Sequence, residues 1–176
     1  MEAVLFPHRT PELDAWLEDR RSRGLDIRDE VWEGVYVVMT PAPGERHGLV
    51  GVRLASLLLP VAEDRGLNVL DAGNVGDPED YRIPDVIVYR RADVDPSGTW
   101  LSTAEVAVEI RSPGEAHDEK LPFYASRGVD EVVLVDPDAR TLRWLALADG
   151  AYTPVERSEV LGVDVQTAIV DRLRWD

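Results

Sequence analysis

The sequence predicts an α/β (α+β) domain in which helices flank a mixed central β-sheet. Three runs rich in β-branched residues, "VIVY", "VAVEI" and "VVLV", are typical of strands that are buried on both faces. Two longer stretches have apolar residues at helical spacing. A strand, a helix and a second strand follow one another across residues 104–137, and such a unit favours a sheet with helices packed on it.

The first element is a helix that begins after Thr10. Threonine is a good N-cap, and Pro11 suits the first helical position. The apolar face of this helix consists of Leu13, Trp16 and Leu17, and Gly24 ends the helix. The next stretch, "LDIRDEVWEGVYVVM", predicts two strands joined at residues 32–34.

The second helix is expected from about Glu45 to Arg65. Gly66 stops it, and Pro60 inside it can kink or break it. "LNVLDAG" then predicts a short strand, and "NVGDPED" predicts a loop.

Two central strands are predicted in "YRIPDVIVYR" and "AEVAVEIRS", and Ser112-Pro113 is expected to end the second. A helix beginning near Asp118 follows, so that Pro122 falls in its tolerant first turn. "DEVVLVDP" and "ARTLRWLAL" predict a hairpin, and residues 150–176 predict a strand and a short helix. We expect one domain over residues 1–176, with a core at about 10–148 and a C-terminal extension at 149–176.

Composition excludes several classes of protein. The formal net charge of the 176 residues is −15, which argues against binding nucleic acid or an anionic membrane through bulk charge. The chain has no cysteine, so disulfides and thiolate chemistry are excluded. No apolar run approaches the ~20 residues that span a bilayer. The first residues are too charged for a signal peptide, and we expect a cytoplasmic protein.

Two acidic residues lie inside apolar strands. Asp85 is part of "IPDVIV" and Glu109 is part of "VAVEIR". A buried carboxylate carries a desolvation cost that a divalent cation can offset, and oxygen ligands favour Mg²⁺ or Mn²⁺. The alternative is that each acid points to solvent at the edge of the sheet.

Lys120 is the single lysine of the chain, and the other 18 of the 19 basic residues are arginine. Lysine can lose its proton when it is buried, whereas arginine keeps its charge. A position that keeps lysine in such a chain can therefore require an amine. The alternative is chance placement on a solvated helix face.

The order of these residues resembles the PD-(D/E)XK nuclease superfamily and, within it, a large bacterial family of restriction endonuclease-like proteins of unknown function. The matching segments run in order along about residues 10–148: Glu33-Gly34, His47, Pro84-Asp85-Val86, Glu109-Ile110-Arg111-Ser112-Pro113, Lys120 to Ala125, and Val135-Asp136-Pro137. The resemblance implies a restriction endonuclease-like core.

The resemblance also implies roles for particular residues. Asp85 and Glu109 would bind Mg²⁺ or Mn²⁺ with the carbonyl of Ile110. Glu33 would be an accessory acid, and Lys120 would hold or deprotonate the attacking water. The superfamily pattern expects lysine two residues after the second acid, and this chain has Arg111 at that position.

Two further residues are candidates for substrate binding. Arg111 could clamp a phosphate or face away. His47 could contact phosphate or water, or could be an ordinary surface or capping histidine. Tyr124 lies four residues after Lys120 on the same helix face, and we expect it in the core.

The sequence thus predicts a Mg²⁺-dependent endonuclease that hydrolyses phosphodiester bonds of DNA, with a homodimer as a plausible way of cutting both strands. The acidic net charge is the main observation against it. Two alternatives stay open. One is a catalytically silent domain that works through protein partners, and the other is a hydrolase of RNA or of small phosphodiesters.

Overall fold

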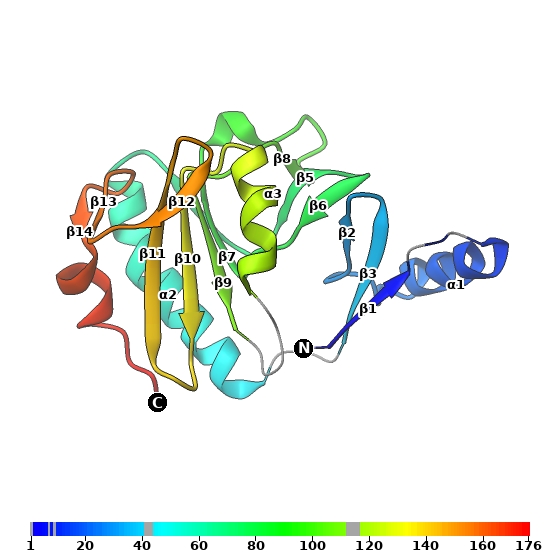
Figure 1. Cartoon of the computed structure of the whole chain (residues 1–176), viewed down its shortest axis with the longest axis horizontal. Coiled ribbons are helices and arrows are strands. Elements are labelled where there is room, and N and C mark those ends of the chain that lie inside the picture. The colour runs from blue at the N-terminus through cyan, green and yellow to red at the C-terminus, as the bar shows by residue number, and fades with distance from the viewer. Residues whose placement is uncertain (1, 7, 9, 41–43, 112–116) are drawn as a thin grey trace.

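A computed structural model describes residues 2–6, 8, 10–40, 44–111 and 117–176. Within these ranges the strands form two six-stranded sheets and one two-stranded sheet, with helices packed against them (Figure 1). This mixed α+β architecture confirms the predicted fold class. The expected strand end at Ser112-Pro113 lies outside the described residues.

The central sheet has the strand order β12-β11-β10-β9-β7-β4. Strands β9 (Val106–Ile110) and β10 (Glu131–Asp136) are parallel, and every other neighbouring pair in this sheet is antiparallel. The chain passes from β9 to β10 through η2 (His117–Lys120) and α3 (Leu121–Ser126), as the sequence predicted. The remaining strands are β4 (Asn68–Asp71), β7 (Val86–Tyr89), β11 (Thr141–Ala148) and β12 (Ala151–Pro154).

Helices cover both faces of this sheet. Side chains alternate between the two faces of a strand, so Val86 and Val88 of β7 pack against α2 (Glu45–Glu63), whereas Ile87 packs with α3 on the opposite face. This explains why the central strands are apolar at every position. Helix α2 ends close to the predicted boundary, and Pro60 lies inside it rather than ending it.

The C-terminal segment is part of the core. It contains β13 (Arg157–Ser158), β14 (Val163–Asp164) and η3 (Gln166–Val170), and its apolar side chains join the cluster under α2. The buried carboxylate of Glu131 ties it to β10. That carboxylate accepts hydrogen bonds from the Ser158 hydroxyl (2.6 Å) and from the backbone N–H groups of Glu159 (2.9 Å) and Val160 (3.2 Å).

The second sheet has the order β1-β3-β2-β6-β5-β8. Its strands are β1 (Glu2–Phe6), β2 (Glu30–Trp32), β3 (Val35–Thr40), β5 (Asn74–Asp77), β6 (Asp80–Arg82) and β8 (Trp100–Leu101). The prediction of a loop at residues 74–80 was wrong, because β5 and β6 form a hairpin there. Strand β1 was not predicted. A short η1 (Arg91–Asp93) precedes β8.

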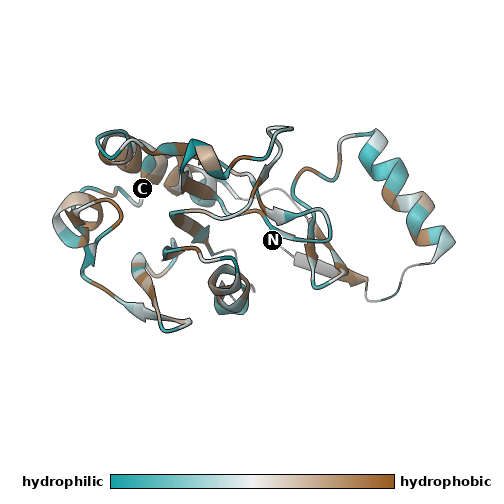
Figure 2. Cartoon of the chain, turned by 90° about the horizontal axis from the view of Figure 1, so that it is seen from above, coloured by the Kyte–Doolittle hydropathy of each residue, from teal (hydrophilic) through white to brown (hydrophobic). Residues whose placement is uncertain are grey.

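We call the described part of residues 2–40 the N-terminal arm. Its helix α1 (Pro11–Ser22) begins at the predicted Thr10 cap and extends away from the central sheet. Figure 2 shows that α1 is largely hydrophilic, and Leu17 is its buried residue. Trp16, expected on the packed face, is 41% exposed.

The hairpin between β2 and β3 decides which acid of the arm faces inward. Glu33 and Gly34 form its two-residue loop, and both have positive φ, 49° and 80°. Such a loop matches the type I′ turn that suits the twist of a hairpin. Glu33 is therefore an exposed turn residue, whereas Glu30 lies on the strand itself and is buried.

No helix in the described ranges is long and apolar enough to cross a membrane.

Candidate active site

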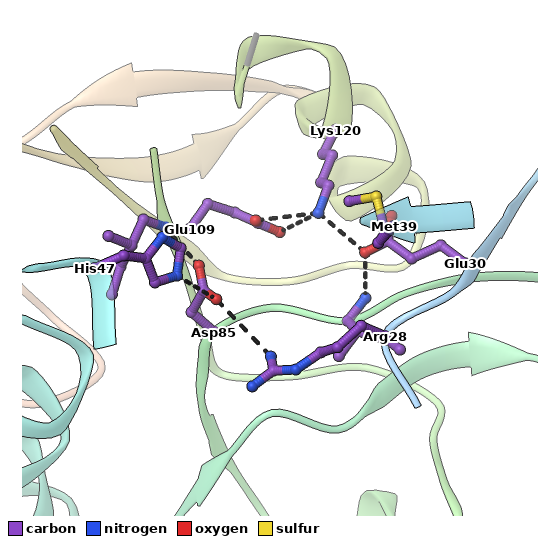
Figure 3. A pocket seen from close by; sticks show the side chains of 9 residues that line it. Arg28, Glu30, Met39, His47, Asp85, Glu109 and Lys120 are labelled. Carbon is purple, nitrogen blue, oxygen red and sulfur yellow. Dashed lines mark hydrogen bonds and ion pairs between the residues drawn. The ribbon is translucent and has the colours of Figure 1, made fainter. Parts of the chain in front are cut away.

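Asp85, Glu109 and Lys120 meet in one small pocket between the central sheet and the N-terminal arm (Figure 3). The pocket encloses about 20 Å³, which is room for roughly one water-sized group. Its lining comprises Arg28, Glu30, Met39, His47, Ile83, Asp85, Glu109, Ile110 and Lys120.

Asp85 lies directly before β7 and is held from two sides. One carboxylate oxygen accepts a hydrogen bond from the backbone N–H of Ile110 at 2.8 Å. The other lies 2.9 Å from Nε2 of His47, which comes from the first turn of α2. These contacts fix the direction of the carboxylate. His47 is thus next to the acid that the sequence singled out, although its predicted contact with substrate stays a prediction.

Glu109 is fully enclosed at the end of β9. Its oxygens accept hydrogen bonds from Lys120 Nζ at 3.1 and 3.2 Å, and the Tyr124 hydroxyl donates a further one. Burial raises the pKa of Glu109 to about 8. Lys120 opposes this shift, and the nearby Asp85 and Glu30 carboxylates add to it. Burial, rather than an excess of negative charge, is thus the main cause of the shift.

Lys120, the last residue of η2, reaches inward and is 5% exposed. Its ammonium also donates to Glu30 Oε1 at 3.0 Å. Burial alone would lower the pKa of Lys120, but the carboxylates of Glu109 and Glu30 outweigh it, and the net shift is upward. Lys120 is therefore a protonated cation in this arrangement, which fits a group that holds charge better than one that accepts a proton.

Glu30 was missed by the sequence reasoning, which chose Glu33. Glu30 is 1% exposed, and it accepts hydrogen bonds from the Ile83 N–H (2.7 Å) and from Trp32 Nε1 (2.6 Å). Glu33 is exposed and is not among the described residues that line the pocket. Its backbone N–H instead donates to Asp80 at 3.0 Å. A signal was available, because the predicted turn at residues 32–34 already placed Glu33 outside the strand.

Of the two alternatives left open for Arg111, a phosphate clamp or a side chain that faces away, the structure shows the second. The Arg111 side chain is 51% exposed and pairs with Asp136 at 3.0 Å, away from the pocket lining. Arg28, which the sequence did not single out, lies in the lining with one third of its side chain exposed. Its guanidinium is 3.9 Å from the Asp85 carboxylate. Arg28 is thus the cation that both touches the pocket and faces solvent.

Tyr124 was predicted in the core, and it is completely buried against Phe123 and the central sheet. Its hydroxyl nevertheless belongs to the site, because it donates to Glu109. Burial and the neighbouring Glu109 carboxylate raise the pKa of Tyr124, so the hydroxyl keeps its proton as a donor.

Comparison with known proteins assigns the chain to a family. Residues 11–170 match the model of the Uma2 family, described as "Putative restriction endonuclease". The chain belongs to the Uma2 family. A crystal structure of "a putative nuclease belonging to DUF820 from Anabaena variabilis" is similar with a TM-score of 0.65 and 16% sequence identity, over 83% of this chain and 91% of that one. This similarity establishes the shared fold.

A weaker similarity is to a chain in the "DrdV-DNA complex", with a TM-score of 0.37 and 15% identity. It covers 68% of this chain but 10% of the other, and at this TM-score it does not establish a shared fold. A search of curated proteins finds no match.

The pocket of this Uma2 protein suits a divalent cation by its donor chemistry. Three carboxyl groups, those of Glu30, Asp85 and Glu109, line the pocket together with the side-chain cations Lys120 and Arg28, and a divalent cation would favour the ionised form of Glu109. No cluster of three or more His, Cys, Asp or Glu side chains in the described ranges is arranged to hold a metal. Two carboxylates and a backbone carbonyl still match Mg²⁺, which keeps several waters and takes few protein ligands.

Proposed function

We propose that this protein is an endonuclease that uses Mg²⁺ or Mn²⁺ to hydrolyse phosphodiester bonds in DNA. The observation that carries the proposal is the meeting of Asp85, Glu109 and Lys120 in one pocket. Asp85 lies directly before β7, Glu109 lies in β9 and Lys120 ends η2, in a chain that belongs to the Uma2 family.

Asp85 and Glu109 are the residues that would hold the metal, with the backbone carbonyl of Ile110. When bound, the metal would polarise the scissile phosphate and lower the pKa of an attacking water. His47 and the Ile110 N–H hold Asp85 in place, and Tyr124 does the same for Glu109. A carboxylate accepts several hydrogen bonds, so these contacts leave lone pairs for a metal.

Lys120 would hold the attacking water or a phosphate oxygen by donating a hydrogen bond. Glu30 also accepts from its ammonium, so the lysine keeps a partner if the Glu109 oxygens turn to a metal. Arg28 is placed at the solvent side of the pocket to pair with the scissile phosphate, because a guanidinium matches phosphate geometry. This local cation offers a way to bind DNA despite the net charge of −15.

Two wider proposals accompany this function. The packing of the C-terminal segment into the core supports one domain over residues 1–176. A homodimer would let two pockets cut the two strands of a duplex.

A plasmid-nicking assay at low salt tests the function. We expect nicking with Mg²⁺ or Mn²⁺, and loss of nicking in EDTA and in Asp85→Ala. Lys120→Arg tests the need for an amine, and it should cut much more slowly than the native protein. Glu33→Ala is the matched control for a site acid, and it should cut at the native rate because Glu33 is an exposed turn residue.

If the native protein nicks no DNA with either metal while it remains folded, the nuclease proposal fails. A silent domain acting through protein partners then becomes the better explanation. If RNA is cut and DNA is not, the metal site survives and the substrate is wrong.

A further inference from the structure

A second, larger pocket lies beside the candidate active site. It encloses about 470 Å³, a volume within the ~300–1,000 Å³ range of small-ligand pockets. The residues of its lining are Arg21, Asp26, Ile27, Asp29, Val31, Tyr36, Asn74, Pro78, Tyr81, Ile83 and Trp100. They come from the end of α1 and the loop after it, and from the strands of the second sheet and the segments that connect them. None of them except Ile83 lines the catalytic pocket.

The two pockets share a wall. Along residues 27–31 the lining alternates: Ile27, Asp29 and Val31 face the large pocket, whereas Arg28 and Glu30 face the catalytic one. Residues 27 and 28 lie in a turn, which the hydrogen bond from the Asp29 N–H to the Asp26 carbonyl (2.9 Å) closes, and β2 begins at Glu30. A group held in the large pocket is therefore separated from the catalytic residues by the segment 27–31 and by Ile83.

The large pocket combines aromatic rings with acceptor groups. Tyr36, Tyr81 and Trp100 are in its lining, and the last two rings pack at a centroid distance of 5.0 Å and an interplanar angle of 74°. Aromatic rings of this kind are stacking platforms for unpaired bases. Asp26 adds a carboxylate that remains 24% exposed and lies 3.7 Å from the guanidinium of Arg21, which is also in the lining. A carboxylate accepts hydrogen bonds from the exocyclic amine of a base but repels phosphate.

We propose that the large pocket binds one unpaired nucleobase of the substrate strand, next to the phosphate that Arg28 contacts. Bases with an exocyclic amine, namely adenine, cytosine and guanine, are favoured over thymine. A base that remains paired and stacked in a duplex does not enter such a pocket, so the preferred substrate is a single strand or a duplex with a base that can swing out. This inference rests on the proposed nuclease function.

Equilibrium binding in EDTA tests the pocket without cleavage. The probe is a single-stranded oligothymidine with one central 2-aminopurine, whose fluorescence falls when it stacks on an aromatic ring. We expect quenching with the native protein and about tenfold weaker binding in Trp100→Ala, because stacking on one ring contributes ~1–3 kcal/mol. Trp16→Ala removes an equally large ring from α1, outside the pocket, and should bind as the native protein does.

Two further variants keep the result interpretable if Trp100→Ala folds poorly. Trp100→Phe keeps a ring and should restore most of the binding. Asp26→Asn should reduce the preference for 2-aminopurine over an oligothymidine competitor. Absence of quenching, or equal losses in Trp100→Ala and Trp16→Ala, would overturn the base pocket even if plasmid nicking succeeds. Quenching that depends on Trp100 would support it even if nicking fails.

Discussion

The central sheet and the N-terminal arm contribute to the same pocket but are built very differently. Strands β7, β9 and β10 are buried on both faces between α2 and α3. The arm packs through a small cluster centred on Leu17, Tyr36 and Val38. The sheet side supplies Asp85, Glu109 and Lys120, and the arm supplies Glu30 and Arg28. The extensively buried sheet thus holds the proposed metal ligands, and the arm, with its smaller apolar cluster, holds a partner of the lysine and the proposed phosphate contact.

The largest expected effect comes from removing the cation that joins the two regions. Lys120→Met should lower the free energy of unfolding by about 3–5 kcal/mol at pH 8 in EDTA, because it leaves buried carboxylates without their partner. Urea unfolding measures this. Arg46→Met, which breaks an exposed ion pair with Asp138, is the control and should cost ~0–1 kcal/mol. A Lys120→Met protein as stable as this control would contradict the prediction.

Truncation of a core side chain in each region should show how much each region contributes to global stability. Leu54→Ala, in α2 under the central sheet, should cost about 2–5 kcal/mol of global stability. Leu17→Ala should cost less and should speed hydrogen exchange mainly in α1, since the cluster around it is small. Equal global losses in the two variants would show that the arm and the sheet unfold as one unit.

Arg28→Ala should reduce kcat/KM for cleavage about tenfold without lowering the melting temperature, because a charge-assisted hydrogen bond contributes ~1.5–3 kcal/mol. Arg111→Ala is its matched control, since Arg111 pairs with Asp136 outside the pocket lining. If Arg111→Ala is the slower enzyme, the assignment of the phosphate contact to Arg28 is wrong, and Arg111 is the phosphate clamp that was one of its two alternatives.

The pH dependence of stability should report on Glu109. Its pKa is raised from an ordinary 4.5 to about 8, so the folded protein keeps a proton that the unfolded chain releases between these values. This contribution to stability is complete below about pH 4.5 and is lost as pH rises through 8. The ordinary pKa of Lys120, 10.5, already lies above this window. Melting temperatures of Glu109→Gln between pH 5 and 8 should therefore fall less than those of the native protein.

The smallest expected effect is a gain. Glu33→Asn should raise the free energy of unfolding by a few tenths to ~1 kcal/mol, because asparagine tolerates the positive φ of a type I′ turn better than glutamate does. Cleavage should be unchanged. A large loss of cleavage together with normal stability would support the original assignment of Glu33 as an accessory acid of the site.

The parts that the sequence predicted well are those in which local pattern and tertiary environment agree. The apolar runs of β7, β9 and β10 and the capped start of α1 belong to this group. Strand β1 was missed because its pairing partner, β3, lies beyond α1 in the sequence. The β5–β6 hairpin was missed because Gly76 and Pro78 are typical of a loop.

The same reasoning applies to the site. Asp85 and Glu109 were conspicuous because acids are rare inside apolar strands, and Lys120 was conspicuous as the single lysine. Glu30 and Arg28 lie in the polar stretch "IRDEVW", where charged residues are common. Their importance depends on the fold that brings this stretch against β9 and η2.

The hydrogen bonds of the Glu131 carboxylate determine when strand β10 can complete its contacts during synthesis of the chain. Ribosomes add residues 158–160 well after Glu131, and until then this buried group lacks three of its hydrogen-bond donors. Strand β10 pairs directly with β9, which carries Glu109. A nascent chain that stops short of these residues would therefore leave the strand beside the pocket without these contacts, and the proposed DNA cleavage would have to await synthesis of the C-terminal segment.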